Sequence, residues 1–177
     1  MAIVKHSSSK NARYEDVLEY YTCRHREDSR TGYYVPILDK YGLMQPRSDC
    51  AALYLTADGT AAAPERWASA CRRTNLCYSK NNKPSDRKSH EYILSHPAAD
   101  RDKLSMDDLV EEGRAFSKAF LQGYDCLIAV HRDTDNDHIH ISINSVRAKA
   151  RAEQAWMMRD SEGNVLPCEI KAGGKHQ

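Results

Sequence analysis

The stretch CLIAVHRDTDNDHIHISIN, Cys126–Asn144, decides how the chain folds. Two apolar runs, CLIAVH and HIHISIN, flank the polar segment RDTDND, which predicts two strands joined by a turn. Side chains alternate along a strand, so the second run separates into an apolar face and a polar face. The residues expected to point into the core are Ile139, Ile141 and Ile143. The residues expected on the polar face are His138, His140, Ser142 and Asn144.

Three histidines are expected to meet on that polar face. His138 and His140 lie two residues apart on one strand, and a tight turn would bring His131 beside them. Three neutral imidazoles that converge form a facial metal site with open positions. An isolated His-x-His pair usually lies on a solvent face, but the third histidine and the nearby aspartates favour a metal site. Asp133 is placed to orient an imidazole ring or to accept a proton.

The composition is that of one globular domain. The chain has 177 residues, 41% hydrophobic and 29% charged, which is enough to bury a sizeable core. No apolar run approaches the roughly 20 residues of a membrane helix, and the first residues lack the apolar stretch of a signal peptide. We therefore expect a cytoplasmic location without membrane insertion. The six cysteines include no C-x-x-C pair and are expected to be reduced thiols.

The remaining elements predict an α+β domain, an antiparallel β-sheet with helices packed on one side. Three helices are expected, within residues 13–25, within 64–78, and after a cap at Ser105. Further strands are expected at residues 2–6 and 89–96. Residues 28–63 contain several turn signals and are expected to form irregular hairpins.

Helical geometry separates the neighbouring tyrosines Tyr20 and Tyr21. At about 100° per residue, Tyr21 shares an apolar arc with Tyr14, Val17 and Leu18, whereas Tyr20 lies well off it. Tyr21 is therefore expected in the core, and Tyr20 is expected to face the metal site.

These motifs resemble the N-terminal domain of P-type mobilisation (MOB-P) relaxases, the conjugative nickases of the HUH endonuclease superfamily. LEYYT resembles the first motif of that family, so that Tyr20 takes the position of the nucleophile. EYILS resembles the second motif, whose serine contacts DNA near the nick and corresponds to Ser95. The resemblance runs from about Ala2 to Arg147. It departs from the family pattern in the tyrosine doublet, which leaves open whether Tyr21 can substitute, and in a longer segment at 28–63.

HRDTDNDHIHISIN resembles the third and most specific motif. The resemblance implies that the metal ligands are His131, His138 and His140, with His131 also part of the catalytic set. It assigns Asp133 as the supporting acid and Asn144 as a DNA contact. The implied ion is Mg²⁺ or Mn²⁺, although three histidines also suit Zn²⁺ or Ni²⁺.

The function implied by the resemblance is strand-specific nicking of plasmid or integrative-element DNA at an origin of transfer, with a 5′-phosphotyrosyl intermediate. The implied fold is a palm-type, two-layer HUH fold. A single relaxase domain would span residues 1–177, as the N-terminal part of a longer bacterial protein. The implied partners are single-stranded origin DNA, a relaxosome accessory protein and the coupling protein of a type IV secretion system.

Six basic residues lie between Cys71 and His90, against Asp86 alone. Such a loop is usually a solvated surface, but next to a nuclease site it becomes a candidate track for DNA phosphates. The candidates are Lys80, Lys83, Arg87 and Lys88, with Lys5 as a further one. The net charge of only +1 argues against an indiscriminate DNA binder.

Two alternatives stay open. The first is a rolling-circle replication initiator or transposase of the same superfamily. Those initiators usually carry their tyrosine after the histidine pair, whereas the last tyrosine here is Tyr124. The second is a relaxosome component that binds DNA without cutting it, which the near-neutral charge allows.

Overall fold

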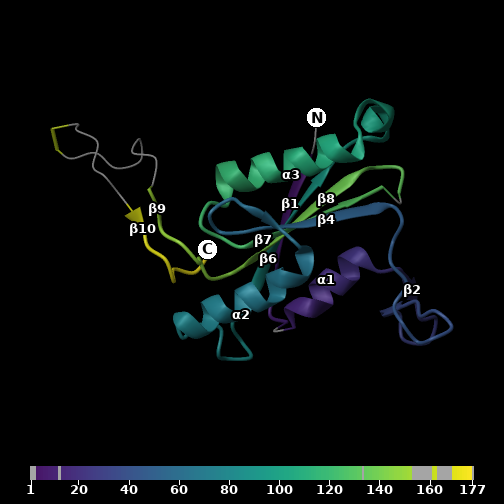
Figure 1. Cartoon of the computed structure of the whole chain (residues 1–177), viewed down its shortest axis with the longest axis horizontal. Coiled ribbons are helices and arrows are strands. Elements are labelled where there is room, and N and C mark those ends of the chain that lie inside the picture. Colours follow the sequence, from purple (N-terminus) through teal and green to yellow (C-terminus); the bar gives the residue numbers. More distant parts are fainter. Residues whose placement is uncertain (1–2, 12, 133, 153–160, 163–168, 177) are drawn as a thin grey trace.

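The computed structural model describes residues 3–11, 13–132, 134–152, 161–162 and 169–176. A six-stranded antiparallel sheet in the order β1-β6-β8-β7-β4-β5 runs through the centre of the molecule (Figure 1). Its strands are β1 (Ile3–Ser9), β4 (Cys50–Leu55), β5 (Ala61–Ala62), β6 (Ser89–Ser95), β7 (Cys126–His131) and β8 (His138–Asn144). Two small sheets pair β2 (His25–Glu27) with β3 (Tyr34–Pro36), and β9 (Arg151–Ala152) with β10 (Glu169–Ile170).

The three predicted helices are present. They are α1 (Tyr14–Thr22), α2 (Trp67–Cys77) and α3 (Met106–Phe120), with short 3-10 turns η1 (Pro64–Arg66) and η2 (Ala98–Lys103). Ser105 caps α3 as predicted, because its hydroxyl accepts a hydrogen bond from the Asp108 amide at 3.1 Å. The Asp108 carboxylate accepts one in return from the Ser105 amide at 2.8 Å, which completes a capping box.

Helix α3 covers the apolar face of the central strands, called here the α3 face. The three isoleucines of β8 are fully buried beneath this helix, as the alternation predicted. Gly113 allows the close approach, because a Cβ there would lie 2.7 Å from Ile128 Cγ2 and 3.0 Å from Ile139 Cγ2. The antiparallel sheet and its packed helices confirm the predicted α+β class.

The opposite face, called the α1 face, is covered by α1 and α2 (Figure 1). A second core forms there around the fully buried Trp67, together with Tyr14 of α1 and Leu127 of β7. The expectation that helices lie on one side only is therefore wrong. The small residues of β7 and β4 on this face leave room for aromatic side chains from both helices.

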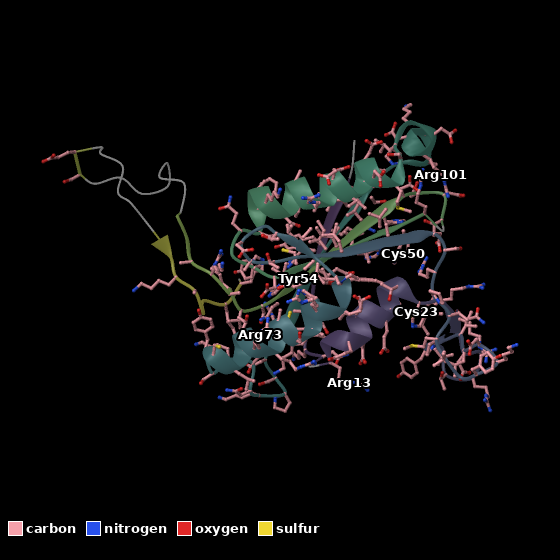
Figure 2. The ribbon with its side chains drawn as sticks, viewed as in Figure 1. Arg13, Cys23, Cys50, Tyr54, Arg73 and Arg101 are labelled. Carbon is pink, nitrogen blue, oxygen red and sulfur yellow. The ribbon has the colours of Figure 1, made fainter. Side chains whose placement is uncertain are left out.

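Strand β4 lies within the region expected to form irregular hairpins, yet it belongs to the main sheet. It pairs with β7 along its whole length, from Cys50 opposite His131 to Leu55 opposite Cys126. Figure 2 shows Cys50 and Tyr54 on this strand, between α3 and the pair α1 and α2. Its sequence, CAALYL, is apolar on both faces, so it lacks the alternation of a half-exposed strand.

The cysteines in the described part of the chain are free thiols, as expected, and Cys168 lies outside that part. Among the described helices, none combines the length and the apolar character needed to cross a membrane.

Candidate active site

The three predicted histidines share the α1 face at one end of β7 and β8. His131 directly opposes His138 in the strand register, and His140 opposes Ala129 two residues further along the strands. The ring centroids of His131 and His140 are 4.7 Å apart, and those of His138 and His140 are 6.3 Å apart. The hairpin therefore brings the three imidazoles together, as its pattern predicted.

In each of these rings, one nitrogen lies within hydrogen-bonding distance of an oxygen atom. The contacts join His131 Nε2 to the Tyr21 carbonyl oxygen at 2.7 Å, His140 Nδ1 to Glu91 Oε1 at 3.0 Å, and His138 Nδ1 to Thr134 Oγ1 at 3.3 Å. Histidines that bind metals commonly hold one ring nitrogen in this way and coordinate through the other. The donor set therefore fits a divalent ion.

The spacing of the rings is wider than that of a closed metal cage. Among the described residues, the trio whose ligand nitrogens lie within 4.8 Å of one another is a different one: His6, His90 and His176. His131, His138 and His140 would have to rotate towards a common point to share an ion.

A cavity of about 280 Å³ joins the histidines to Tyr20. Its lining comprises Lys5, Tyr20, Arg47, Ile93, Ser95, His131, Thr134, His138 and His140. Tyr20 is 48% exposed, whereas Tyr21 is 2% exposed, which is the division that helical geometry predicted. A phenol, three imidazoles and the serine of the second motif therefore face one cavity.

Tyr21 is fixed in the core by its hydroxyl group. The hydroxyl donates to Glu91 Oε1 and lies 2.8 Å from Ser142 Oγ. Burial, and then the neighbouring Glu91 carboxylate, raise the pKa of Tyr21 well above its usual value. Tyr21 therefore keeps its proton at neutral pH.

Glu91 is a site residue that the sequence analysis missed. Although burial alone would raise it, hydrogen bonds from His140 and Tyr21 lower the pKa of Glu91 below its usual value. An ionised carboxylate thus holds the His140 ring. The signal was present in EYILS, because residues four apart on a strand, here Glu91 and Ser95, point to the same face. The acid expected from the sequence, Asp133, lies outside the described residues.

Hydrogen bonds hold the turn between β7 and β8 to η2. The Arg101 guanidinium, labelled in Figure 2, donates to the carbonyl oxygens of Thr134 and Arg132. Arg132 donates back to the Arg101 carbonyl oxygen at 2.6 Å and pairs with the buried Asp137 at 3.0 Å. These contacts limit the freedom of the β7–β8 turn.

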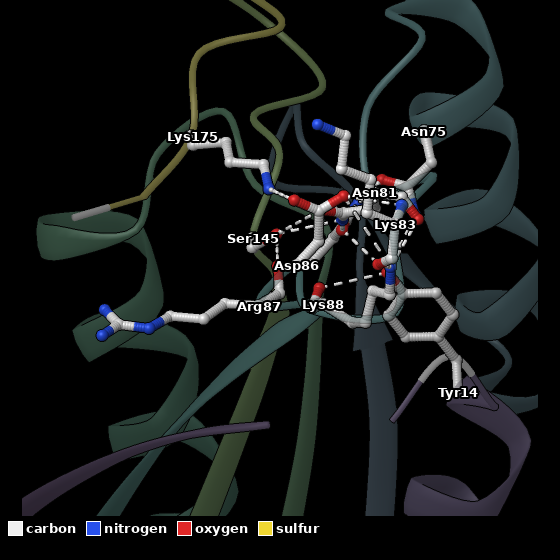
Figure 3. Close-up of polar contacts among 10 residues, drawn as sticks. Tyr14, Asn75, Asn81, Lys83, Asp86, Arg87, Lys88, Ser145 and Lys175 are labelled. Atoms are coloured by element: carbon white, nitrogen blue, oxygen red, sulfur yellow. Dashed lines mark hydrogen bonds and ion pairs between the residues drawn. The ribbon is translucent and has the colours of Figure 1, made fainter. Parts of the chain in front are cut away.

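The basic loop lies away from this cavity. It precedes Ser89, at the far end of β6 from Ser95, and six residues of strand span about 20 Å. Lys88 is 3% exposed, and its ammonium group donates to the carbonyl oxygens of Asn81 and Lys83 (Figure 3). This corrects the expectation that Lys88 contacts DNA, because its charge holds the loop together. The remaining candidates, Lys80, Lys83 and Arg87, are exposed at this far end.

Asn144 is also structural. It is fully buried, and its amide nitrogen donates to the Cys71 carbonyl oxygen at 3.3 Å. Its amide oxygen accepts from the Tyr14 hydroxyl at 3.1 Å. The expected DNA contact at Asn144 is corrected accordingly, because α1 and α2 cover this end of the polar face.

Comparison with known families agrees with the site. A family model described as "Relaxase: MobA/VirD2-like, nuclease domain" matches residues 45–163, well over half of the chain. The match contains the three histidines, Glu91 and Ser95. No curated protein matches the chain significantly. With its histidine hairpin, its cavity and this match, the chain belongs to the relaxase family, with a MobA/VirD2-like nuclease domain.

Proposed function

We propose that this relaxase is a metal-dependent DNA transesterase of the MOB-P group that nicks one strand at an origin of transfer. The observation that carries the proposal is the shared cavity of Tyr20 and the three histidines. It would act in the bacterial cytoplasm on single-stranded or locally melted DNA. A relaxosome accessory protein and a type IV coupling protein would be its partners. The 1–177 segment would act as one nickase domain of a longer protein.

Tyr20 would supply the nucleophile. Its phenol oxygen attacks the scissile phosphorus, a phosphorus–oxygen bond to tyrosine forms, and the bond from phosphorus to the 3′ oxygen breaks. The phenol proton passes to a base, for which Asp133 is our candidate, and the departing 3′ oxygen takes up a proton. The products are a 5′-phosphotyrosyl protein and a free 3′ hydroxyl. Because the phosphodiester is exchanged and not hydrolysed, the reverse step can rejoin strands without ATP.

His131, His138 and His140 would hold the divalent ion, which is Mg²⁺ or Mn²⁺ in use, while imidazoles also suit Zn²⁺ or Ni²⁺. When bound, such an ion withdraws charge from the non-bridging phosphate oxygens in the transition state. Glu91 keeps the His140 ring oriented. Ser95 and Lys5 line the same cavity and would contact the strand near the nick.

The place of the tyrosine supports a conjugative relaxase over the alternatives. Tyr20 precedes the histidines in the chain and reaches them from α1, whereas a replication initiator of this superfamily usually carries its tyrosine after them. A protein that only binds DNA has no use for an exposed phenol beside three imidazoles.

Covalent capture tests the proposal. We expect the protein, incubated with a labelled pool of single-stranded DNA and Mn²⁺, to give a covalent band on a denaturing gel. The captured strands should share one cleavage site, and a chelator should abolish the band. A mobility shift on a native gel without any covalent band would mean that the protein binds without cutting.

A lobe of exposed tyrosines adjoins the cavity. The lobe, residues 24–47, contains β2 and β3 and exposes Tyr33 and Tyr41 (74% each) and Tyr34 (63%). Both of its ends meet the site, since the rings of Tyr20 and His25 are 5.5 Å apart and Arg47 lines the cavity. Aromatic faces beside basic residues suit the stacking of unpaired bases. We propose that the strand leaves the cavity over this lobe.

Replacing Tyr33 or Tyr41 with alanine should weaken the binding of a fluorescent single strand about tenfold each, because stacking contributes roughly 1–3 kcal/mol per base. Phe120→Ala is the matched control, since Phe120 is 65% exposed but lies on α3, across the sheet. If anisotropy titrations give the same affinity for all the variants, the lobe is not part of the binding surface.

A further inference from the structure

A second histidine cluster lies on the α3 face, on the other side of the sheet from the active site. His6 of β1, His90 of β6 and His176 near the C-terminal end each offer a ring nitrogen, and these nitrogens lie within 4.8 Å of one another. His6 Nε2 and His90 Nδ1 are 3.0 Å apart, and the two rings stack with an interplanar angle of 5°. The His176 ring meets His90 edge-on, with centroids 4.7 Å apart.

The backbone fixes His176 in this place. Its amide donates to the Ser145 carbonyl oxygen at 2.7 Å, and the preceding residue, Lys175, forms a β-bridge with Val146. Its Nε2 lies 2.6 Å from the Tyr92 hydroxyl, and its Nδ1 lies 3.3 Å from the Tyr124 hydroxyl. One tyrosine can therefore keep the ring oriented while the other ring nitrogen turns to a ligand.

His90 supplies an independent observation. It is 1% exposed, and its Nε2 has no hydrogen-bond partner among the described residues. A buried polar atom without a hydrogen-bond partner is unfavourable, and a bound ligand would offset that cost. Burial, together with His176 and His6, also lowers the pKa of His90 to about 4, so its ring is neutral at pH 7. Neutral imidazole is the form that coordinates metals.

We propose that His6, His90 and His176 bind a transition-metal ion of the zinc class, as a site separate from the catalytic one. Three imidazoles without a carboxylate suit Zn²⁺, Co²⁺ or Ni²⁺, whereas Mg²⁺ requires oxygen ligands. Zinc–nitrogen distances of about 2.0–2.1 Å at tetrahedral angles require nitrogens about 3.4 Å apart, which small ring rotations would provide. A water molecule would complete the tetrahedron.

The bound ion would link β1 to β6 and to the C-terminal segment. His6 and His90 are 84 residues apart in the chain, and β1 is an edge strand whose side chains are almost all exposed. Its residues alternate between the two faces, so that His6 points to the cluster while Lys5 lines the catalytic cavity. Fixing His6 would therefore also fix the position of Lys5.

Metal stoichiometry tests the site directly. After incubation with Zn²⁺ and dialysis, bound zinc is measured in the wild type and in the triple variant His131→Ala, His138→Ala, His140→Ala. We expect the triple variant to retain one equivalent, and to lose it when His176→Ala is added. Because these ligands are absent from the triple variant, a retained ion reports the new site whether or not the catalytic set binds zinc.

His176→Ala alone serves if the triple variant does not fold by circular dichroism. It should lose one equivalent relative to the wild type, and Zn²⁺ should raise its melting temperature less. Cys77→Ser, which removes an exposed thiol, should leave the stoichiometry unchanged. Zinc retained at the wild-type level in His176→Ala, or an unchanged zinc-dependent melting shift, would overturn the proposal.

Discussion

Tyr20→Phe is expected to abolish the covalent DNA adduct and to lower cleavage at least about a thousandfold, because the reaction loses its nucleophile. The variant removes one hydroxyl from a half-exposed ring, so the fold and the binding of single-stranded DNA should remain. The measurement is covalent capture on a denaturing gel beside a binding titration with the same oligonucleotide.

Tyr21→Phe is the matched control. The Tyr21 hydroxyl is buried against Glu91 and Ser142, so its loss should cost roughly 1–3 kcal/mol of stability. The adduct should still form. A covalent band from Tyr20→Phe, or a folded Tyr21→Phe that gives none, would transfer the nucleophile's role to the second tyrosine.

His140→Ala is expected to lower metal-supported cleavage by about a thousandfold. The estimate follows from the several kcal/mol of charge stabilisation that a bound ion supplies, at about 1.4 kcal/mol for each factor of ten. His140 occupies the middle of the trio, with ring contacts to both His131 and His138. Cleavage rates measured across a Mn²⁺ titration would separate weaker ion binding from a slower chemical step.

Glu91→Gln should give an intermediate loss of about 10–100-fold, since it removes the charge that orients His140 but keeps the side-chain shape. Glu112→Gln is the comparison variant, because Glu112 pairs with His96 at 2.9 Å away from the cavity. If both glutamine variants cleave at the wild-type rate, Glu91 has no positioning role.

Local periodicity was enough to predict the β7–β8 hairpin, the three helices and the burial of Tyr21 beside an exposed Tyr20. These features depend on neighbours within a few residues, where alternation and helical arcs decide which side is buried. The convergence of the histidines followed for the same reason, since one short turn joins their two strands.

Features set by distant segments did not follow from the sequence. Ser142 and Asn144 belong to the polar face that was expected to hold the metal site, with Asn144 as a DNA contact, yet α1 and α2 bury both residues and satisfy their hydrogen bonds. The charge of Lys88 suggested a DNA contact, although its ammonium group donates hydrogen bonds to local carbonyl oxygens. The sequence did not predict strand β4, because a strand buried on both faces shows no alternation of apolar and polar residues.

Strand β1 has a consequence for self-association. It forms one border of the main sheet, where backbone groups not paired with β6 would offer a template for another strand. Its sequence, IVKHSSS, places a lysine and three serines along that border. A cationic, hydroxyl-rich edge strand is poorly suited to cross-β stacking. The composition of β1 therefore disfavours polymerisation through edge-to-edge pairing of the sheet.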